Sequence, residues 1–169
     1  ATIVERVRSY AKGTRSERVS SEVSELVNKA VREFKRQSGE RVEVWVLQEQ
    51  PVYIIVNPLE FELVIINLLR NAAQALQELG VLNPKVALTI KREDNKALIA
   101  IEDNGHIEKE KIEKLSEPTN STKADGLGLG LQIVRSIIEN HGGKIFFSRA
   151  ASGGLRVEIR LPAEETTEQ

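Results

Sequence analysis

The stretch Gly126–Lys144 reads GLGLGLQIVRSIIENHGGK. Three glycines alternate with leucines and lead into an apolar segment whose Ile133, Val134, Ile137 and Ile138 recur at helical spacing. The pattern predicts a buried helix that begins in a run of glycines.

Glycines at the start of a helix leave backbone N–H groups uncovered at the positive end of the helix dipole, which favours phosphate binding. A flexible linker is the alternative, but it does not explain the bulky leucines between the glycines. The run is not a P-loop, because no Gly-Lys-Ser/Thr follows it, and its spacing is not that of the dinucleotide fingerprint.

A second helix is predicted from Asn57, which is a good N-cap, with Pro58 at the first helical position and Glu60 completing a capping box. One broad face is apolar and consists of Ile65, Ile66, Leu68, Leu69, Ala72, Ala73, Ala75, Leu76 and Leu79. The opposite stripe is polar and consists of Asn67, Arg70, Asn71, Gln74 and Glu78.

Asn67 and Asn71 are the unusual members of the polar stripe. The stripe as a whole is compatible with an ordinary solvated helix face. However, Asn is a poor helix former, and exposed faces usually favour Lys and Glu. Two amide oxygens four residues apart are hard ligands that suit Mg²⁺ together with its waters and substrate phosphates.

A third feature is a predicted strand that ends in a carboxylate, in the stretch IAIEDNG (99–105). A strand closing in an Asn-Gly turn is one interpretation. In the functional interpretation, Asp103 accepts a hydrogen bond from a ligand amino group, and Gly105 lets the ligand approach the backbone.

The remaining elements are predicted from periodicity and turn residues. We expect a helix over 2–12, a polar joint over 14–18, and a longer helix from Ser21, which can cap it, to Gly39. Predicted strands cover Arg41–Leu47 and Val52–Val56 around a QEQP turn. Two hairpins pair Lys85–Arg92 with Lys96–Asp103, and Ile145–Arg149 with Leu155–Leu161. The class is α+β.

Composition narrows the functional classes. The chain has 169 residues, a net charge of −1 and 29% charged residues, which argues against a nucleic-acid or membrane surface. The absence of cysteine excludes disulfides and thiolate metal sites. No apolar run reaches the roughly 20 residues of a membrane span. Because the chain also lacks methionine and starts at Ala1, we expect a fragment of a longer protein.

In order along the chain, these features resemble the ATP-binding catalytic domain of bacterial sensor histidine kinases. NLLRNA (67–72) resembles the family's asparagine box, and DNG (103–105) its first glycine box. EPTNSTK (117–123) resembles the phenylalanine-box and lid region, and DGLGLGL (125–131) the second glycine box. The resemblance covers residues 19–162 and is strongest to kinases that sense nitrogen status, oxygen or C4-dicarboxylates.

The resemblance implies the fold shared by histidine kinases, gyrase and heat-shock-chaperone ATPases, a two-layer α/β sandwich. A mixed, mostly antiparallel sheet carries helices on one face. The implied ligands are ATP and Mg²⁺. Asp103 would contact the adenine amino group, Asn71 with Asn67 would handle Mg²⁺ and the phosphates, and Lys123 would reach a phosphate. The other implied nucleotide contacts are Gly105, Gly126, Leu127, Gly128, Leu129 and Gly130.

The resemblance also implies how the chain is divided and what it works with. Residues 1–13 would end a dimerisation-domain helix, 14–18 form a hinge, 19–162 form the catalytic domain and 163–169 a disordered tail. The γ-phosphoryl group would pass to a histidine on the missing upstream domain and then to a response regulator. The parent protein would be a homodimer attached to the inner membrane, with this domain in the cytoplasm.

Two departures from the family pattern stand out. DNGHI lacks the second glycine of Asp-x-Gly-x-Gly, and Ser116, Thr119 and Asn120 replace the lid phenylalanines. A nucleotide-binding regulatory module with little or no kinase activity therefore remains an alternative. The ATPases of topoisomerases and mismatch repair rank lower, because they carry a catalytic Glu where this chain has Asn67. His106 and His141 are expected to be structural surface residues.

Overall fold

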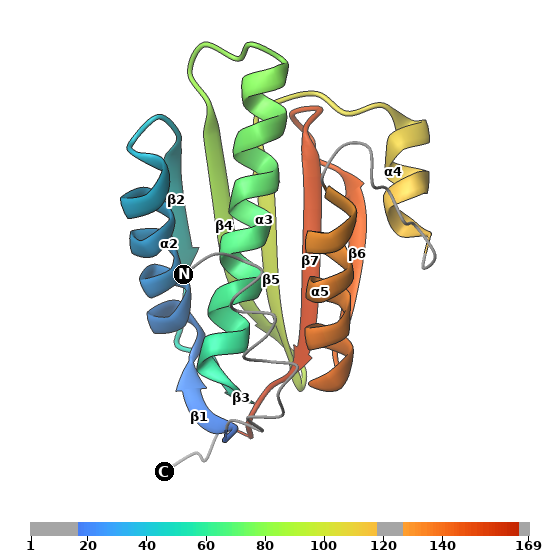
Figure 1. Ribbon diagram of the computed structural model, residues 1–169. Coiled ribbons are helices and arrows are strands. Elements are labelled where there is room, and N and C mark those ends of the chain that lie inside the picture. The colour runs from blue at the N-terminus through green and yellow to red at the C-terminus, as the bar shows by residue number, and fades with distance from the viewer. Residues whose placement is uncertain (1–16, 118–126, 166–169) are drawn as a thin grey trace.

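The computed structural model describes residues 17–117 and 127–165. A five-stranded sheet forms one layer, and α2, α3 and α5 cover one of its faces (Figure 1). The strand order is β2-β4-β5-β7-β6. The strands are β2 (Glu43–Gln48), β4 (Lys85–Glu93), β5 (Lys96–Asp103), β6 (Lys144–Arg149) and β7 (Leu155–Pro162). The predicted two-layer α+β fold is confirmed.

Both predicted hairpins are present. β4 and β5 are antiparallel and close through Asp94, whose φ is 53°. β6 and β7 are antiparallel as well. In β7 the apolar Val157, Ile159 and Leu161 are buried, while the intervening charged residues stay at least partly exposed. This alternation is what a sheet with one covered face requires.

The segments on either side of the QEQP turn do not pair with each other. β2 lies parallel to β4, whereas β3 (Tyr53–Val56) is antiparallel to β1 (Val19–Glu22), a strand that the sequence did not indicate. The backbone N–H of Val23 donates to the carbonyl of Val52 over 2.9 Å. The chain after the turn is thus held at the start of α2 (Val23–Ser38) and does not return along β2.

The helix predictions need two corrections. The N-cap of α2 is Glu22, without a side-chain cap hydrogen bond, and the Ser21 hydroxyl donates to the carbonyl of Val19. The helix ends at Gly39 as predicted, with φ 76°. The helix α4 (Lys109–Ser116), in which Leu115 is buried, is not among the helices that the sequence analysis predicted. A helix with so few apolar positions gives almost no periodic signal.

α3 (Pro58–Glu78) is the central helix. Its cap is confirmed, since the Asn57 side chain accepts a hydrogen bond from the Glu60 N–H. The predicted capping box is not formed. The Asn57 N–H donates to Nε2 of His141 over 3.2 Å, so it is unavailable to the Glu60 side chain. Every residue over 61–69 is buried, since α3 lies on the sheet between α2 and α5 (Figure 1). Each of its fully buried large aliphatic side chains contributes about 1.5–3 kcal/mol.

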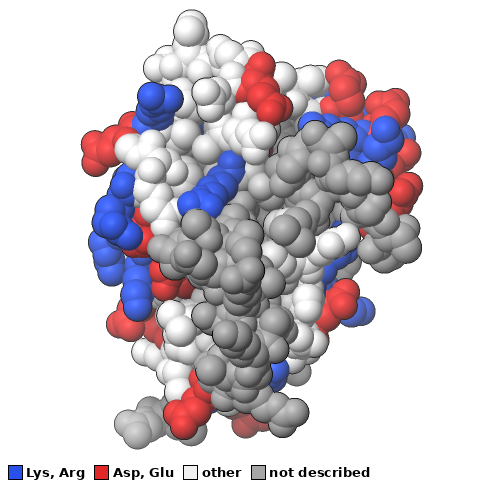
Figure 2. Space-filling model, viewed as in Figure 1, with Lys and Arg blue, Asp and Glu red and all other residues white. Residues whose placement is uncertain are grey.

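The surface is mixed in charge, as composition predicted. Figure 2 shows Lys and Arg side chains interspersed with Asp and Glu on the helix-covered face. Among the described residues, no helix has both the length and the apolar character required to cross a bilayer.

Candidate functional site

A cavity of about 330 Å³ opens at the end of β5, which is within the size range of small-molecule sites. α3 and α4 contribute to its walls, together with β5, β7 and the start of α5 (Leu127–Asn140). Its apolar lining includes Leu68, Ala72, Leu79, Ile101, Leu131 and Val157, and its polar lining consists of Asn71, Glu78, Asp103, His106, Glu108 and Lys111.

Asp103 is the last residue of β5 and is 7% exposed. Burial raises the pKa of its carboxyl group, and hydrogen bonds from the backbone N–H groups of Gly105 and Leu155 oppose the rise. Both donors reach the same oxygen, Oδ1, at 2.9 and 3.4 Å. The other carboxylate oxygen can therefore accept a hydrogen bond from a ligand in the cavity.

Gly105 keeps this turn close to α3. A Cβ atom there would lie 3.0 Å from Leu76 and 3.1 Å from both Asp103 Oδ1 and Leu79. A side chain would have to displace these atoms, so the small residue has a packing role. Its direct contact with a ligand stays a prediction.

The turn between β6 and β7 supports Asp103 in a way that sequence reasoning missed. A Cβ atom at Gly154 would lie 2.1 Å from the backbone oxygen of Asp103 and 2.4 Å from its Oδ1. The neighbouring Gly153 carbonyl accepts a hydrogen bond from the Ile107 N–H over 3.0 Å. The pair of glycines in ASGG is the sequence signal that could have indicated this close approach. Most turns need only one glycine, so the second one required another explanation.

The polar stripe of α3 divides into two parts. Asn71 lines the cavity, whereas Asn67 is 2% exposed and donates its side-chain N–H to the Leu63 carbonyl over 2.8 Å. Because the side-chain nitrogen of Asn67 makes this hydrogen bond, the side-chain oxygen is the atom that can contact a ligand. A Cβ atom at Gly130 would lie 3.5 Å from that oxygen. The first turns of α5 therefore pack against the asparagine-bearing turns of α3.

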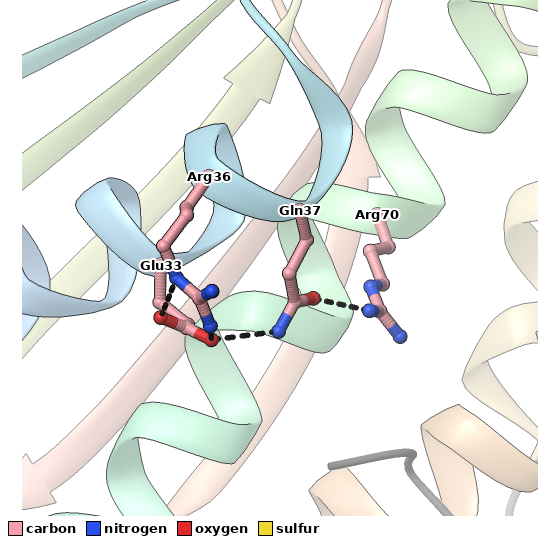
Figure 3. A network of polar contacts seen from close by, with 4 residues as sticks. All are labelled: Glu33, Arg36, Gln37 and Arg70. Carbon is pink, nitrogen blue, oxygen red and sulfur yellow. Dashed lines mark hydrogen bonds and ion pairs between the residues drawn. The ribbon is translucent and has the colours of Figure 1, made fainter.

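Arg70 is held away from this group. Its guanidinium donates to the Gln37 side chain on α2, and Gln37 donates in turn to Glu33 over 2.9 Å (Figure 3). Arg36 joins the same carboxylate through Nε at 3.0 Å. The network ties α2 to α3, so Arg70 belongs to the interface between these helices.

The glycine run lies partly inside α5, which begins at Leu127. Gly128 and Gly130 thus belong to the first turn, so the helix begins within the run of glycines, as predicted. The first four N–H groups of any helix, here those of residues 127–130, lack partners within the helix. Lys123 and Gly126 lie outside the described residues.

The donor set fits a magnesium ion that is held mainly by a phosphate ligand. In the part of the chain that the structure describes, no group of three or more His, Asp and Glu residues is placed to hold a metal. Mg²⁺ usually keeps several waters and binds through one or two protein oxygens plus substrate phosphates. Amide oxygens, such as those of Asn67 and Asn71, are ligands of this kind, and their role here stays a prediction.

The two histidines differ in their surroundings. His106 is on the surface, as expected, with Nε2 3.0 Å from Glu108 and Nδ1 3.3 Å from the Arg149 guanidinium. His141 is not a surface residue, since it is 7% exposed. It lies after the last turn of α5, where the N-cap of α3 covers it.

Comparison with known proteins gives consistent matches. TdiS, a sensor protein of Thauera aromatica, is 32% identical over 95% of this chain, which spans 30% of the length of TdiS. DctS, a C4-dicarboxylate transport sensor protein of Rhodobacter capsulatus, is 26% identical over 96% of this chain and matches over 25% of its own length. The chain therefore spans less than a third of these relatives.

Among solved structures, the nucleotide-free catalytic domain of the histidine kinase ThkA superposes with a TM-score of 0.73 and 27% identity. The match covers 86% of this chain and 95% of the ThkA domain. The family described as histidine kinase-, DNA gyrase B- and HSP90-like ATPase matches residues 56–165. That range contains Asn67, Asn71, Asp103 and the glycine run, and this chain belongs to that family.

Proposed function

We propose that this chain binds Mg·ATP in the cavity at the end of β5 and transfers the γ-phosphoryl group to a histidine on another domain of the same protein. One observation carries the proposal. A buried carboxylate, an asparagine and a residue directly after the first turn of a helix border the same cavity, at Asp103, Asn71 and Leu131. The carboxylate suits the amino group of a base, the asparagine suits a metal ion bound to phosphate, and the helix start suits phosphate oxygens.

Each group has a distinct proposed role. Asp103 accepts a hydrogen bond from the adenine amino group, and the apolar walls take the ring. The uncovered N–H groups of residues 127–130 face the phosphates, since a helix N-terminus favours anions. Asn71, with Asn67, ligates Mg²⁺, which when bound would neutralise charge on the phosphates. Lys123 and Gly126 remain proposed phosphate contacts.

In the proposed transfer, an imidazole nitrogen of the acceptor histidine forms a bond to the γ-phosphorus. The bond from that phosphorus to the bridging oxygen breaks, ADP leaves, and the imidazole releases its N–H proton. Such reactions depend on in-line positioning and charge stabilisation and need little covalent chemistry from the protein. Asn67 carries an amide where an ATP-hydrolysing relative would carry a general base, which favours transfer over hydrolysis.

The acceptor is not a histidine of the described residues. Both ring nitrogens of His141 are hydrogen-bonded within the fold, and the His106 ring lies between Glu108 and Arg149. We therefore place the acceptor in an upstream dimerisation domain. The further partners we propose are a response regulator, and a second copy of the parent protein in a membrane-attached homodimer.

Calorimetric titration with ATP, with and without Mg²⁺, tests the binding part. Incubation with γ-labelled ATP tests the chemistry, first with this chain alone and then with a separately prepared acceptor domain. We expect bound ATP to stay intact alone, and label to appear on the acceptor. Binding without any transfer would favour the alternative of a regulatory module. Rapid hydrolysis by the chain alone would favour the topoisomerase-like ATPases.

A further inference from the structure

Several segments meet at the end of the domain opposite the cavity. α3 begins there after Asn57, and α5 ends there at Asn140. β1 and β3 lie at the same end, at the bottom of Figure 1. Arg18 directly precedes β1 and is at the start of the described chain.

His141 connects the two helices at this end. Its Nε2 accepts the Asn57 backbone N–H over 3.2 Å, so the ring proton is on Nδ1, which donates to the Ile137 carbonyl over 2.8 Å. The ring is 7% exposed. The side chain thereby joins the last turn of α5 to the N-cap of α3.

Arg18 attaches the incoming chain to the same place. Its guanidinium donates to the Asn140 carbonyl over 2.7 Å. That carbonyl lies in the last turn of α5, where a cation suits the negative end of the helix dipole. After Arg18 the chain forms β1, which pairs with β3, and β3 leads directly into Asn57. The entering segment is thus hydrogen-bonded to the end of α5 and to the strand that leads into α3.

The other ends of these helices border the cavity. Asn71 is fourteen residues along α3 from Asn57, which corresponds to about 20 Å of rigid helix. Near that level Gly130 packs against Asn67, with only 3.5 Å between a Cβ atom built there and the asparagine oxygen. A shift of α5 along α3 at one end must therefore change the spacing of the groups at the other.

We propose that Arg18 and His141 are positioning residues, which fix α5 against α3 and connect the chain entering the domain to its affinity for nucleotide. The inference rests on the proposed nucleotide site. Neither residue touches the nucleotide. A displacement of the segment before β1 acts on Arg18, then on the end of α5, and so on the first turns of that helix. By thermodynamic reciprocity, bound ATP must then stabilise the Arg18 contact.

The first test measures the ATP affinity of the full chain in the presence of Mg²⁺. Arg18→Ala is expected to raise the Kd about fivefold, at the lower end of typical couplings between distant sites. Arg18→Lys keeps a cationic donor and should recover most of the affinity. Arg32→Ala removes an exposed cation of α2 and serves as the matched control, with an unchanged Kd. His141→Phe fills a similar volume without either hydrogen bond and should weaken binding more.

Hydrogen exchange separates this role from a local structural one. In Arg18→Ala, amides over 130–134 and 67–71 should exchange faster, while those of β4 and β5 should not change. Faster exchange confined to the last turn of α5, with wild-type ATP affinity, would overturn the inference. If wild-type protein failed to bind ATP, the proposed function would fail, and exchange at 130–134 would still decide whether the connection exists. Failure of His141→Phe to fold leaves Arg18→Ala as the deciding variant.

Discussion

Replacing Asp103 by asparagine separates the binding role of its carboxylate from its structural role. Asn Oδ1 can still accept hydrogen bonds from the Gly105 and Leu155 N–H groups, which now reach Asp103 Oδ1. The charge that would face the adenine amino group is lost. A hydrogen bond to a charged acceptor exceeds one to a neutral acceptor by about 1–2 kcal/mol. The Kd for ATP should thus rise about 5- to 30-fold.

The direction in which the same substitution changes the stability of the fold follows from the pKa of Asp103. Burial raises the pKa of Asp103 in the folded protein, so the folded state binds a proton more readily than the unfolded state. This group's contribution to stability therefore increases as pH falls through the folded-state pKa and is lost as pH rises above it. Asp103→Asn lacks the buried charge, so it should be as stable as wild type or more stable at neutral pH. The difference should shrink on acidification.

The assay combines ATP calorimetry with urea unfolding at several pH values. Glu102→Gln is the matched control, because it removes a carboxylate one residue earlier on β5, where Glu102 pairs with Arg156 at 3.5 Å and does not line the cavity. It should leave the Kd unchanged. A folded Asp103→Asn variant with wild-type ATP affinity would remove Asp103 from the site. Marked destabilisation at neutral pH would refute the electrostatic reasoning.

Four further variants test the site and the helix ends. Gly154→Ala puts a Cβ atom 2.1 Å from the Asp103 backbone oxygen, so it should destabilise the fold by about 1–3 kcal/mol and lower ATP affinity at least tenfold in calorimetry. Gly39→Ala, whose Cβ atom would meet nothing within 4 Å, should lower stability through its positive φ alone and leave affinity unchanged. Asn71→Ala should reduce Mg²⁺-dependent phosphoryl transfer in a longer protein far more than it reduces ATP binding, and wild-type transfer rates would contradict the metal role. Asn57→Ala removes the cap of α3 and should cost about 0.5–2 kcal/mol, measured by urea unfolding; an unchanged midpoint would show that the cap is dispensable.

Local signals were sufficient for much of the fold and for the main site residues. The hairpins over 85–103 and 144–162 follow from alternating strands and their turn residues, and the cap at Asn57 and the stop at Gly39 follow from helix-end chemistry. These features depend on residues within a few positions of one another. The motifs at Asn71 and Asp103 were recognisable for the same reason, and the structure places both in one cavity.

Tertiary structure alone decided the contacts between distant segments. No local pattern shows that β2 pairs with β4. Parallel strands are not joined by a short turn whose residues could be recognised in the sequence. The N–H of Leu155 meets Asp103 across 52 positions, and the N–H of Asn57 meets His141 across 84. Such contacts depend on how helices and strands pack in space. The sequence by itself therefore indicated most of the helices and strands and the candidate site residues, whereas packing decided how the strands pair and what holds those residues in place.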